Sequence, residues 1–240
     1  MPFEFPVEFD PSNFSLQTIR EKYLDFGLVL DQYDVILQAV FVTLLLALLA
    51  EALGIVLGLS LSLMKISRSR LLRFPAQLYI DVFRGTPLLV QIIFIYFATP
   101  LIGIRFSSLF FAGLAALMLN GAAYVAEIFR SGIQSIDKGQ MEAGRASGLT
   151  YAQTMRHIIV PQAFRRVIPP LTNEFVMLVK DTSIVSVIGL EELLRAARVL
   201  QSSTANATPL VAAALIYLAI CLPLIYLSGG LERRLNRRTA

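Results

Sequence analysis

Residues 36–63 read ILQAVFVTLLLALLAEALGIVLGLSLSL, an apolar run with a single ionisable side chain, Glu51. A helix that crosses the hydrocarbon core of a bilayer needs roughly 20 apolar residues. Inside that core, only helices and closed barrels satisfy every backbone amide and carbonyl group. The run therefore predicts a transmembrane helix, and it sets the class of the whole fold.

Four further apolar stretches are long enough to span a membrane: residues 78–102, 108–129, 168–190 and 209–230. The chain of 240 residues is 56% hydrophobic and 16% charged, and its mean hydropathy is +0.67. This composition is typical of a membrane protein and leaves no room for an additional soluble enzyme domain. We expect an all-α integral membrane protein with about five transmembrane helices.

The basic residues predict the orientation of the chain, because Lys and Arg are enriched in cytoplasmic connections. Fourteen of them follow the first, third and fifth spans: Lys65, Arg68, Arg70, Arg73, Arg130, Lys138, Arg145, Arg156, Arg165, Arg166, Arg233, Arg234, Arg237 and Arg238. The other side holds Arg20, Lys22, Arg105, Arg195 and Arg198. We therefore expect the N-terminus outside and the C-terminus in the cytoplasm. Such short clusters differ from the continuous basic stripe of a nucleic-acid-binding protein.

The chain divides into three parts on this basis: an extracytoplasmic segment 1–34, a transmembrane domain 35–232 and a basic cytoplasmic tail 233–240. The first 34 residues are acidic, unlike a signal peptide, so we expect no cleaved leader. Apolar residues in this segment recur at helical spacing: Phe14, Leu16, Ile19, Tyr23, Phe26 and Leu30. They favour an amphipathic helix on the outer surface, and a partly ordered tail is the alternative.

The longest polar connection runs from residue 130 to residue 166, and its centre, 137–161, reads DKGQMEAGRASGLTYAQTMRHIIVP. Asp137 is a favourable N-cap, and Gln140 stands where a capping box requires Gln or Glu. The helix that follows is predicted to end at Gly148, since glycine readily adopts the left-handed conformation beyond a helix C-terminus.

A second short helix is predicted after this glycine. Thr150 and Gln153 repeat the capping box, and Pro161, which cannot continue a regular helix, ends it. The two helices would expose Met141, Leu149, Tyr151 and Met155 beside their charged residues. An exposed mixed surface of this kind indicates a docking site for a partner protein.

Within this pair, Glu142-Ala143-Gly144, then Gly148, then Ile158-Ile159-Val160-Pro161 resembles the signature loop of ATP-binding-cassette importer permeases. That loop is summarised as Glu-Ala-Ala, three residues, Gly, nine residues, Ile, any residue, Leu-Pro. Gly144 and Val160 depart from it. The stretches RGTPLLVQ (84–91) and NEF through KDTS (173–183) are similar to the branch that carries polar amino acids: histidine, arginine, glutamine, glutamate and opines. The likeness covers nearly the whole chain after residue 34.

The resemblance implies a transport subunit in the bacterial inner membrane, with no catalytic residue of its own. The signature loop would be a coupling helix that docks on an ATP-hydrolysing subunit through Glu142, Ala143, Gly144, Gly148 and Pro161. Glu142 would make polar contacts and Gly148 would permit the turn. The implied partners are two such ATPase subunits, a second permease subunit, an extracytoplasmic binding protein and a polar amino acid. ATP and Mg²⁺ would bind to the ATPase, since this chain has no Gly-x-x-x-x-Gly-Lys-Ser/Thr loop.

Ionisable residues within a span cost on the order of 2.5–3.5 kcal/mol each, so they indicate function or a partner. Glu174 and Asp181 are seven residues apart, which places both carboxylates on one helix face, whereas Lys180 points elsewhere. They are candidates for a substrate's ammonium or guanidinium group along the translocation path. The alternative is that Glu174 caps the span at the interface and Asp181 neutralises a basic residue. Glu51 has no partner that the sequence identifies.

The stretch Arg84-Gly85-Thr86-Pro87 interrupts the second span. Thr86 as N-cap and Pro87 at the first helical position would start a new half-helix, whose amide groups can bind an anion such as a substrate carboxylate. The alternative is a structural kink at which Asp81 and Arg84 form an ion pair. In the first span, Gly54 and Gly58 are one turn apart and favour close packing with a neighbouring helix.

Two other classes of function compete with a coupled importer. An ion-gradient-driven transporter or channel subunit would use the buried carboxylates as ion sites, but it leaves the cytoplasmic helix pair without a purpose. An intramembrane enzyme would need a nucleophile or a carboxylate pair with a base, and no such arrangement stands out in the spans. His157, the only histidine, lies on the second cytoplasmic helix and is expected to be solvated or part of the docking surface.

Overall fold

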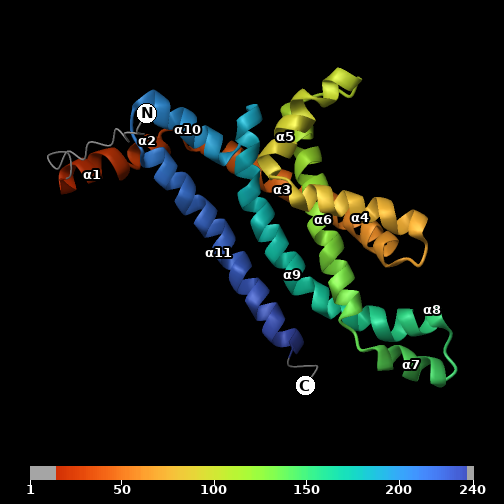
Figure 1. Cartoon of the computed structure of the whole chain (residues 1–240). Coiled ribbons are helices and arrows are strands. Elements are labelled where there is room, and N and C mark those ends of the chain that lie inside the picture. The colour runs from red at the N-terminus through yellow and green to blue at the C-terminus, as the bar shows by residue number, and fades with distance from the viewer. Residues whose placement is uncertain (1–14, 237–240) are drawn as a thin grey trace, which may run out of the picture.

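The computed structural model describes residues 15–236, with side chains through Arg233, and this part of the chain is helical and contains no strand (Figure 1). Residues 1–14 and 237–240 lie outside the described residues, including Phe14 of the predicted amphipathic helix and Arg237 and Arg238 of the predicted tail. The elements in chain order are α1 (Leu16–Tyr23), α2 (Gly27–Leu30), α3 (Tyr33–Ile66), α4 (Arg70–Gly85), α5 (Leu88–Phe97), η2 (Thr99–Ile102), α6 (Leu109–Gln134), α7 (Lys138–Ala146), α8 (Tyr151–Thr154), η3 (Met155–Ile159), α9 (Val160–Asp181), η4 (Thr182–Ile188), α10 (Leu193–Thr204) and α11 (Thr208–Asn236).

Three of the described helices are long and apolar enough to cross a membrane: α3, α6 and α11. The predicted second span is a bent pair, because α4 and α5 meet at 108°. The predicted fourth span corresponds to α9, which begins at Val160 and continues into the 3₁₀ turn η4. Helix α9 does not meet the same apolar criterion, since it carries Arg165, Arg166, Glu174, Lys180 and Asp181.

Helices α3 and α6 form the centre of the fold, and glycine allows their close approach. A Cβ atom added to Gly58 would lie 2.8 Å from the carbonyl oxygen of Ala122 and 2.7 Å from a methyl carbon of Val125. One added to Gly54 would lie at an ordinary 3.6 Å from the Ala122 amide nitrogen. The predicted packing role of the two glycines is confirmed, and Gly58 is the position where only hydrogen fits.

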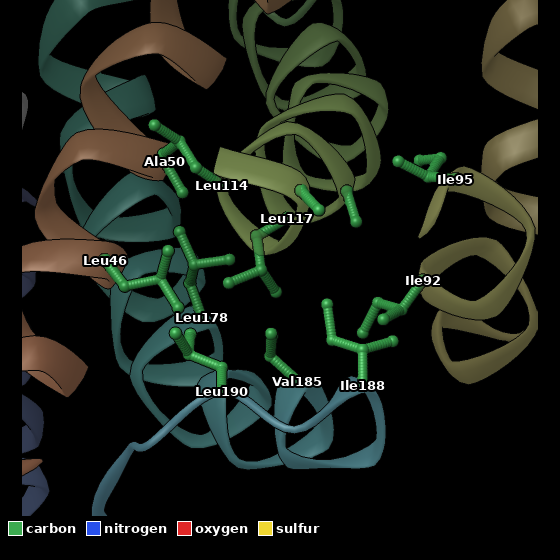
Figure 2. Close-up of a cluster of buried hydrophobic side chains, with 12 residues drawn as sticks. Leu46, Ala50, Ile92, Ile95, Leu114, Leu117, Leu178, Val185, Ile188 and Leu190 are labelled. Carbon is green, nitrogen blue, oxygen red and sulfur yellow. The ribbon is translucent and has the colours of Figure 1, made fainter. Parts of the chain in front are cut away.

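The main apolar core joins α3 and α6 to α5, α9 and η4. Figure 2 shows Leu46 from α3, Leu117 from α6, Ile92 from α5 and Leu178 from α9 pointing toward one another. The turn of η4 closes this cluster with Val185 and Ile188. The core therefore fixes both halves of the bent pair and the charged helix α9 around α6.

The described part of the N-terminal segment forms two short helices instead of one. The C-cap of α1 is Leu24, and none of the residues of α1 is buried. Two hydrogen bonds attach this segment to the turn between α10 and α11. The backbone amide of Ala207 donates to the backbone carbonyl of Lys22 at 2.9 Å. The side-chain amide of Asn206 donates to the backbone carbonyl of Glu21 at 2.8 Å. A single continuous amphipathic helix over 14–30 is therefore wrong.

The two ends of the molecule differ in character. In Figure 1, α7 and α8 lie at the end where α11 finishes, and α1, α2 and α10 lie at the opposite end. The polar helix pair and the C-terminal end of α11 thus share one side of the fold. This arrangement agrees with the distribution of Lys and Arg along the sequence.

Candidate functional site

The first helix of the polar pair, α7, begins and ends at residues with defined capping roles. The carboxylate of Asp137 accepts the amide hydrogen of Gly139 at 2.7 Å, which confirms the predicted N-cap. The capping box with Gln140 is wrong, because the Gln140 side chain instead accepts a hydrogen bond from Gln162 of α9 at 3.3 Å. A hydrogen bond between residues 22 positions apart in the chain thus replaces the predicted bond within α7.

The turn after α7 has the hydrogen bonds of a Schellman motif. Gly148 has a φ of +85°, its amide donates to the carbonyl of Arg145 at 3.1 Å, and the amide of Leu149 donates to the carbonyl of Gly144 at 3.2 Å. Only glycine adopts such a φ without steric cost. The predicted role of Gly148 as the residue that turns the chain is confirmed.

The second helix, α8, begins with the predicted capping box of Thr150 and Gln153. It does not end at Pro161, however. The chain widens into the π-helical turn η3 and runs directly into α9, with Pro161 in the first turn of that helix. A proline ring disrupts the hydrogen-bond ladder of a regular helix, and a π turn is a recognised place where that ladder is adjusted. The prediction that Pro161 stops the helix is therefore wrong.

Gly144 lies between the two helices of the pair. It is buried, and a Cβ atom there would lie 2.5 Å from the methyl carbon of Thr154 and 3.1 Å from the Cδ1 atom of Ile158. Thr154 is fully buried and donates its hydroxyl to the carbonyl of Thr150 at 3.0 Å. Gly144 is thus the residue that lets α7 and α8 touch, and it does not lie on their outer surface.

The pair is packed onto the ends of α6 and α9 by an apolar cluster. Its buried members are Ile136, Ile159 and Ala163, with Ile133, Met141, Met155 and Ile158 packed against them. In addition, Arg166 of α9 donates to the carbonyl of Ser135 at the end of α6, at 2.5 Å. Of the four residues expected to be exposed, Met141, Leu149 and Met155 are half-buried, and Tyr151 is 62% exposed.

The outer surface of the pair holds four of the five residues that the signature loop singles out. Glu142 and Ala143 of α7 are exposed, as are Gly148 in the turn and Pro161 at the start of α9. A groove of about 500 Å³ lies where α7 and η3 meet the end of α6, lined by residues that include Gln134, Lys138, Met141 and Met155. We call these four exposed residues, Glu142, Ala143, Gly148 and Pro161, the docking surface.

Three carboxylates lie within the predicted first and fourth spans: Glu51 on α3, and Glu174 and Asp181 on α9. Glu51 of α3 is only 7% exposed, and within the described residues neither of its oxygen atoms has a hydrogen-bond partner. It lies on α3, which packs against α9, the helix that carries Glu174 and Asp181. Both α9 carboxylates are half-buried, whereas Lys180 is exposed.

Glu174 lies in the interior of α9, not at its end. Glu174 is therefore not a helix N-cap, since α9 starts 14 residues before it, at Val160. The early start follows the π turn before Pro161, and Pro169 and Pro170 lie inside the helix. The shared face of Glu174 and Asp181 was predictable from spacing, but the position of Glu51 depends on how α3 packs against α9.

The break between α4 and α5 occurs at the predicted residues, but its details differ. Thr86 is the C-cap of α4 in an extended conformation, as expected for a residue before proline, and Pro87 is the N-cap of α5. The Thr86 hydroxyl donates back to the carbonyl of Val82 at 2.8 Å. Thr86 as the N-cap of the new half-helix is therefore wrong.

Arg84 and Asp81 do not form the predicted ion pair. Asp81 accepts from Gln77 at 2.6 Å, and Arg84 lies 3.9 Å from Glu127 and over the ring of Tyr124. Glu127 also binds Lys65 at 2.5 Å and Arg130 at 2.8 Å. This cluster connects α3, α4 and α6. The Glu127–Arg130 spacing on one helix could have indicated one of its contacts, but the other two come from distant helices.

Comparison with known proteins identifies relatives along nearly the whole chain. Residues 54–237 match the family described as "Binding-protein-dependent transport system inner membrane component". The chain is 42% identical over 215 residues to the arginine transport system permease protein ArtQ of Bacillus subtilis (strain 168), covering 89% of this chain and 98% of that protein. It is 39% identical over 202 residues to the putative glutamine transport system permease protein GlnP of Rickettsia bellii (strain RML369-C), covering 83% and 92%.

Solved structures agree with these sequence matches. The structure of an amino acid ABC transporter with histidines superposes with a TM-score of 0.83 at 41% identity, and covers 88% of this chain and 98% of that chain. The inward-facing MetNI methionine ABC transporter superposes with a TM-score of 0.72 at 19% identity, covering 85% and 98%. At the lower identity the likeness concerns the fold alone.

Proposed function

Since this chain belongs to the binding-protein-dependent transport system inner membrane components, we propose that it carries polar amino acids inward as the permease subunit of an ATP-driven importer. The observation that carries the proposal is the helix pair α7–α8. It is capped at both starts, turned by Gly148 and continuous with α9. Because the pair is continuous with α9, a displacement of the pair by a cytoplasmic partner would also move the membrane domain.

The docking surface is where we expect the ATPase subunit to bind. Glu142 offers an exposed carboxylate, and Ala143 beside it leaves room for close contact. Gly144 supports the surface from beneath, because its lack of a side chain sets the spacing of α7 and α8. Two copies of the ATPase, each with its own ATP and Mg²⁺, would serve two permease subunits, since one such bundle cannot enclose a path alone.

Movement of the helix pair would reach two transmembrane helices at once. The pair continues into α9 through η3 without a loop, and α9 is tied to the end of α6 by the bond between Arg166 and Ser135. A valine methyl group of Val167 fills the space that a Cβ atom of Gly132 would occupy, so α6 and α9 also cross closely. These contacts support a rigid transfer of displacement from the cytoplasm into the bundle.

The translocation path, on this proposal, runs along the face of α9 that carries Glu174 and Asp181. Their negative charges suit the ammonium or guanidinium group of a cationic amino acid, and ArtQ is by its name an arginine permease. Arg84 and Thr86 at the break would lie beside the substrate carboxylate, near the first amides of α5. The substrate would be delivered by an extracytoplasmic binding protein.

The proposed topology has five spans: α3, the broken pair α4–α5, α6, α9 and α11. The N-terminus is outside, the α7–α8 pair and the C-terminus are cytoplasmic, and the membrane is the bacterial inner membrane. The positions of the Lys and Arg clusters support this orientation. The division into 1–34, 35–232 with the coupling segment 137–161, and 233–240 follows from the same topology.

The proposal is tested by transport in proteoliposomes that contain the permease, its ATPase and binding protein loaded with radiolabelled arginine. We expect uptake that requires ATP inside the ATPase-containing vesicles and disappears when the ATPase is omitted. Uptake that persists without the ATPase and follows an imposed proton or sodium gradient would instead identify a secondary transporter.

A further inference from the structure

The break between α4 and α5 leaves backbone carbonyl groups without their usual amide donors. Pro87 has no amide hydrogen, so the carbonyl of Phe83, four residues earlier, cannot receive the bond that a continuous helix would supply. The carbonyls of Val82 and Thr86 lie at the same break, where the helix ladder ends. In an apolar environment such groups are costly unless other donors reach them.

Side chains supply these donors. Gln91, on the first turns of α5, reaches back with its amide nitrogen to the carbonyl oxygen of Phe83 at 2.8 Å and to the carbonyl oxygen of Thr86 at 3.1 Å. The same nitrogen lies 2.8 Å from the Thr86 hydroxyl, which itself donates to the carbonyl of Val82 at 2.8 Å. Three carbonyls of the break are thus satisfied by two side chains.

Asn120 of α6 completes the arrangement. Its amide nitrogen donates to the side-chain oxygen of Gln91 at 2.9 Å and approaches the Phe83 carbonyl at 3.4 Å. Both amide side chains are buried, with 8% exposure for Gln91 and 7% for Asn120. The break is therefore bonded to itself and also to α6, the helix that runs into the α7–α8 pair.

The network would serve no purpose in a straight span. A continuous helix would satisfy its own carbonyls, and apolar side chains at both positions would then be the less costly choice. The 108° bend is the feature that requires the donors. Their attachment to α6 makes the orientation of α5 depend on α6.

We propose that Gln91 and Asn120 are positioning residues for transport, which hold α5 at its angle to α4 and make the break move together with α6. This inference rests on the proposed function, because it assigns the pair a part in the movement that the α7–α8 helices drive. Arg84 and Thr86 of the proposed path lie at the same break. Gln91 and Asn120 would therefore fix the positions of these two residues relative to the substrate. Its loss is expected to slow turnover more than it weakens binding of the loaded binding protein.

The test compares Gln91→Leu, Asn120→Leu, the double variant and the exchange Gln91→Asn with Asn120→Gln, all in the full complex in proteoliposomes. We expect each single Leu variant to lower the rate of ATP-driven uptake about tenfold or more, with the half-saturating concentration of binding protein within about twofold. The double variant should be no worse than the poorer single one, because both remove one network. The exchange keeps two amides of unchanged total length and should recover part of the loss.

A matched control is Gln38→Leu on α3, which makes the same substitution at an exposed position away from the break and should transport like the unaltered protein. Spin labels at Leu78→Cys and Phe97→Cys, in a Cys221→Ser background, report the angle between α4 and α5. In the Leu variants the distance between the labels is expected to lengthen or spread.

Unaltered transport in both single variants would overturn the inference, and so would an unchanged label distance or strictly additive losses. If a Leu variant fails to assemble, Asn120→Ala is measured instead with the same criteria, and the exchange variant should transport better than Asn120→Ala. A complex in which the unaltered permease itself shows no ATP-dependent uptake would refute the proposed function, which is a different outcome from a selective loss in the variants.

Discussion

Single residues decide whether the coupling pair can form, and Gly144 is the clearest case. The signature loop usually has alanine at this position, and glycine here faces Thr154, whose methyl group occupies the space that a Cβ atom would need. The glycine that replaces the usual alanine therefore leaves the space that the Thr154 side chain on the facing helix occupies. Sequence alone could show that position 144 departs from the pattern, but it could not show which residue fills the gap.

We predict that Gly144→Ala lowers the free energy of unfolding of the protein by about 1–3 kcal/mol, because overpacking a buried contact forces neighbouring atoms to move. Thr154→Ser removes the methyl group and keeps the hydroxyl that binds the Thr150 carbonyl. The double variant Gly144→Ala with Thr154→Ser should therefore be more stable than Gly144→Ala alone. Thermal unfolding of the three purified variants measures this coupling, and equal effects with and without Thr154→Ser would contradict it.

At the scale of elements, local signals predicted where helices begin and turn, and longer-range packing decided where they continue. The caps at Asp137 and Thr150 and the turn at Gly148 were predictable, because each depends on residues within one turn. The passage of α9 through Pro161 was not, since the π turn depends on how the helix pair meets α6. For the same reason Gln140 binds Gln162 instead of closing its own cap.

The contact between α3 and α6 provides a prediction at this scale. Gly58→Ala should destabilise the protein by about 1–3 kcal/mol, because the added carbon would meet a backbone carbonyl of Ala122 that cannot rotate away. Gly54→Ala, one turn away on the same helix, is the matched control and should be tolerated, since its nearest neighbour would be at ordinary contact distance. Thermal stability in detergent distinguishes them, and similar values for both variants would refute the packing argument.

For the whole molecule, hydropathy predicted the helical membrane class but not how each span is built. The second span is broken because Thr86 precedes proline and must be extended. The helix α9 is less apolar than α3, α6 and α11, since it carries charged residues at five positions, of which Arg166 bonds to the end of α6. The packing of α3, which carries Glu51, against α9, which carries Glu174, lies beyond what spacing along one helix can predict.

The orientation of the molecule is testable with two single-cysteine variants in a Cys221→Ser background. Val199→Cys on α10 and Arg68→Cys between α3 and α4 are both exposed positions, at opposite sides of the proposed topology. A membrane-impermeant maleimide added to intact cells should label Val199→Cys at once, and Arg68→Cys only after the membrane is permeabilised. The reverse pattern would invert the topology.

The central claim is that the α7–α8 pair transmits ATP-driven movement to the membrane domain. The most direct test measures uptake and ATP hydrolysis together in proteoliposomes that contain the Glu142→Ala variant. The control is Glu191→Ala, which removes an exposed glutamate next to α10, at the other end of the fold. The account predicts that Glu142→Ala inserts normally but moves at least about tenfold fewer amino acids per ATP, whereas Glu191→Ala keeps the ratio of the unaltered protein. An unchanged ratio in Glu142→Ala would contradict the account.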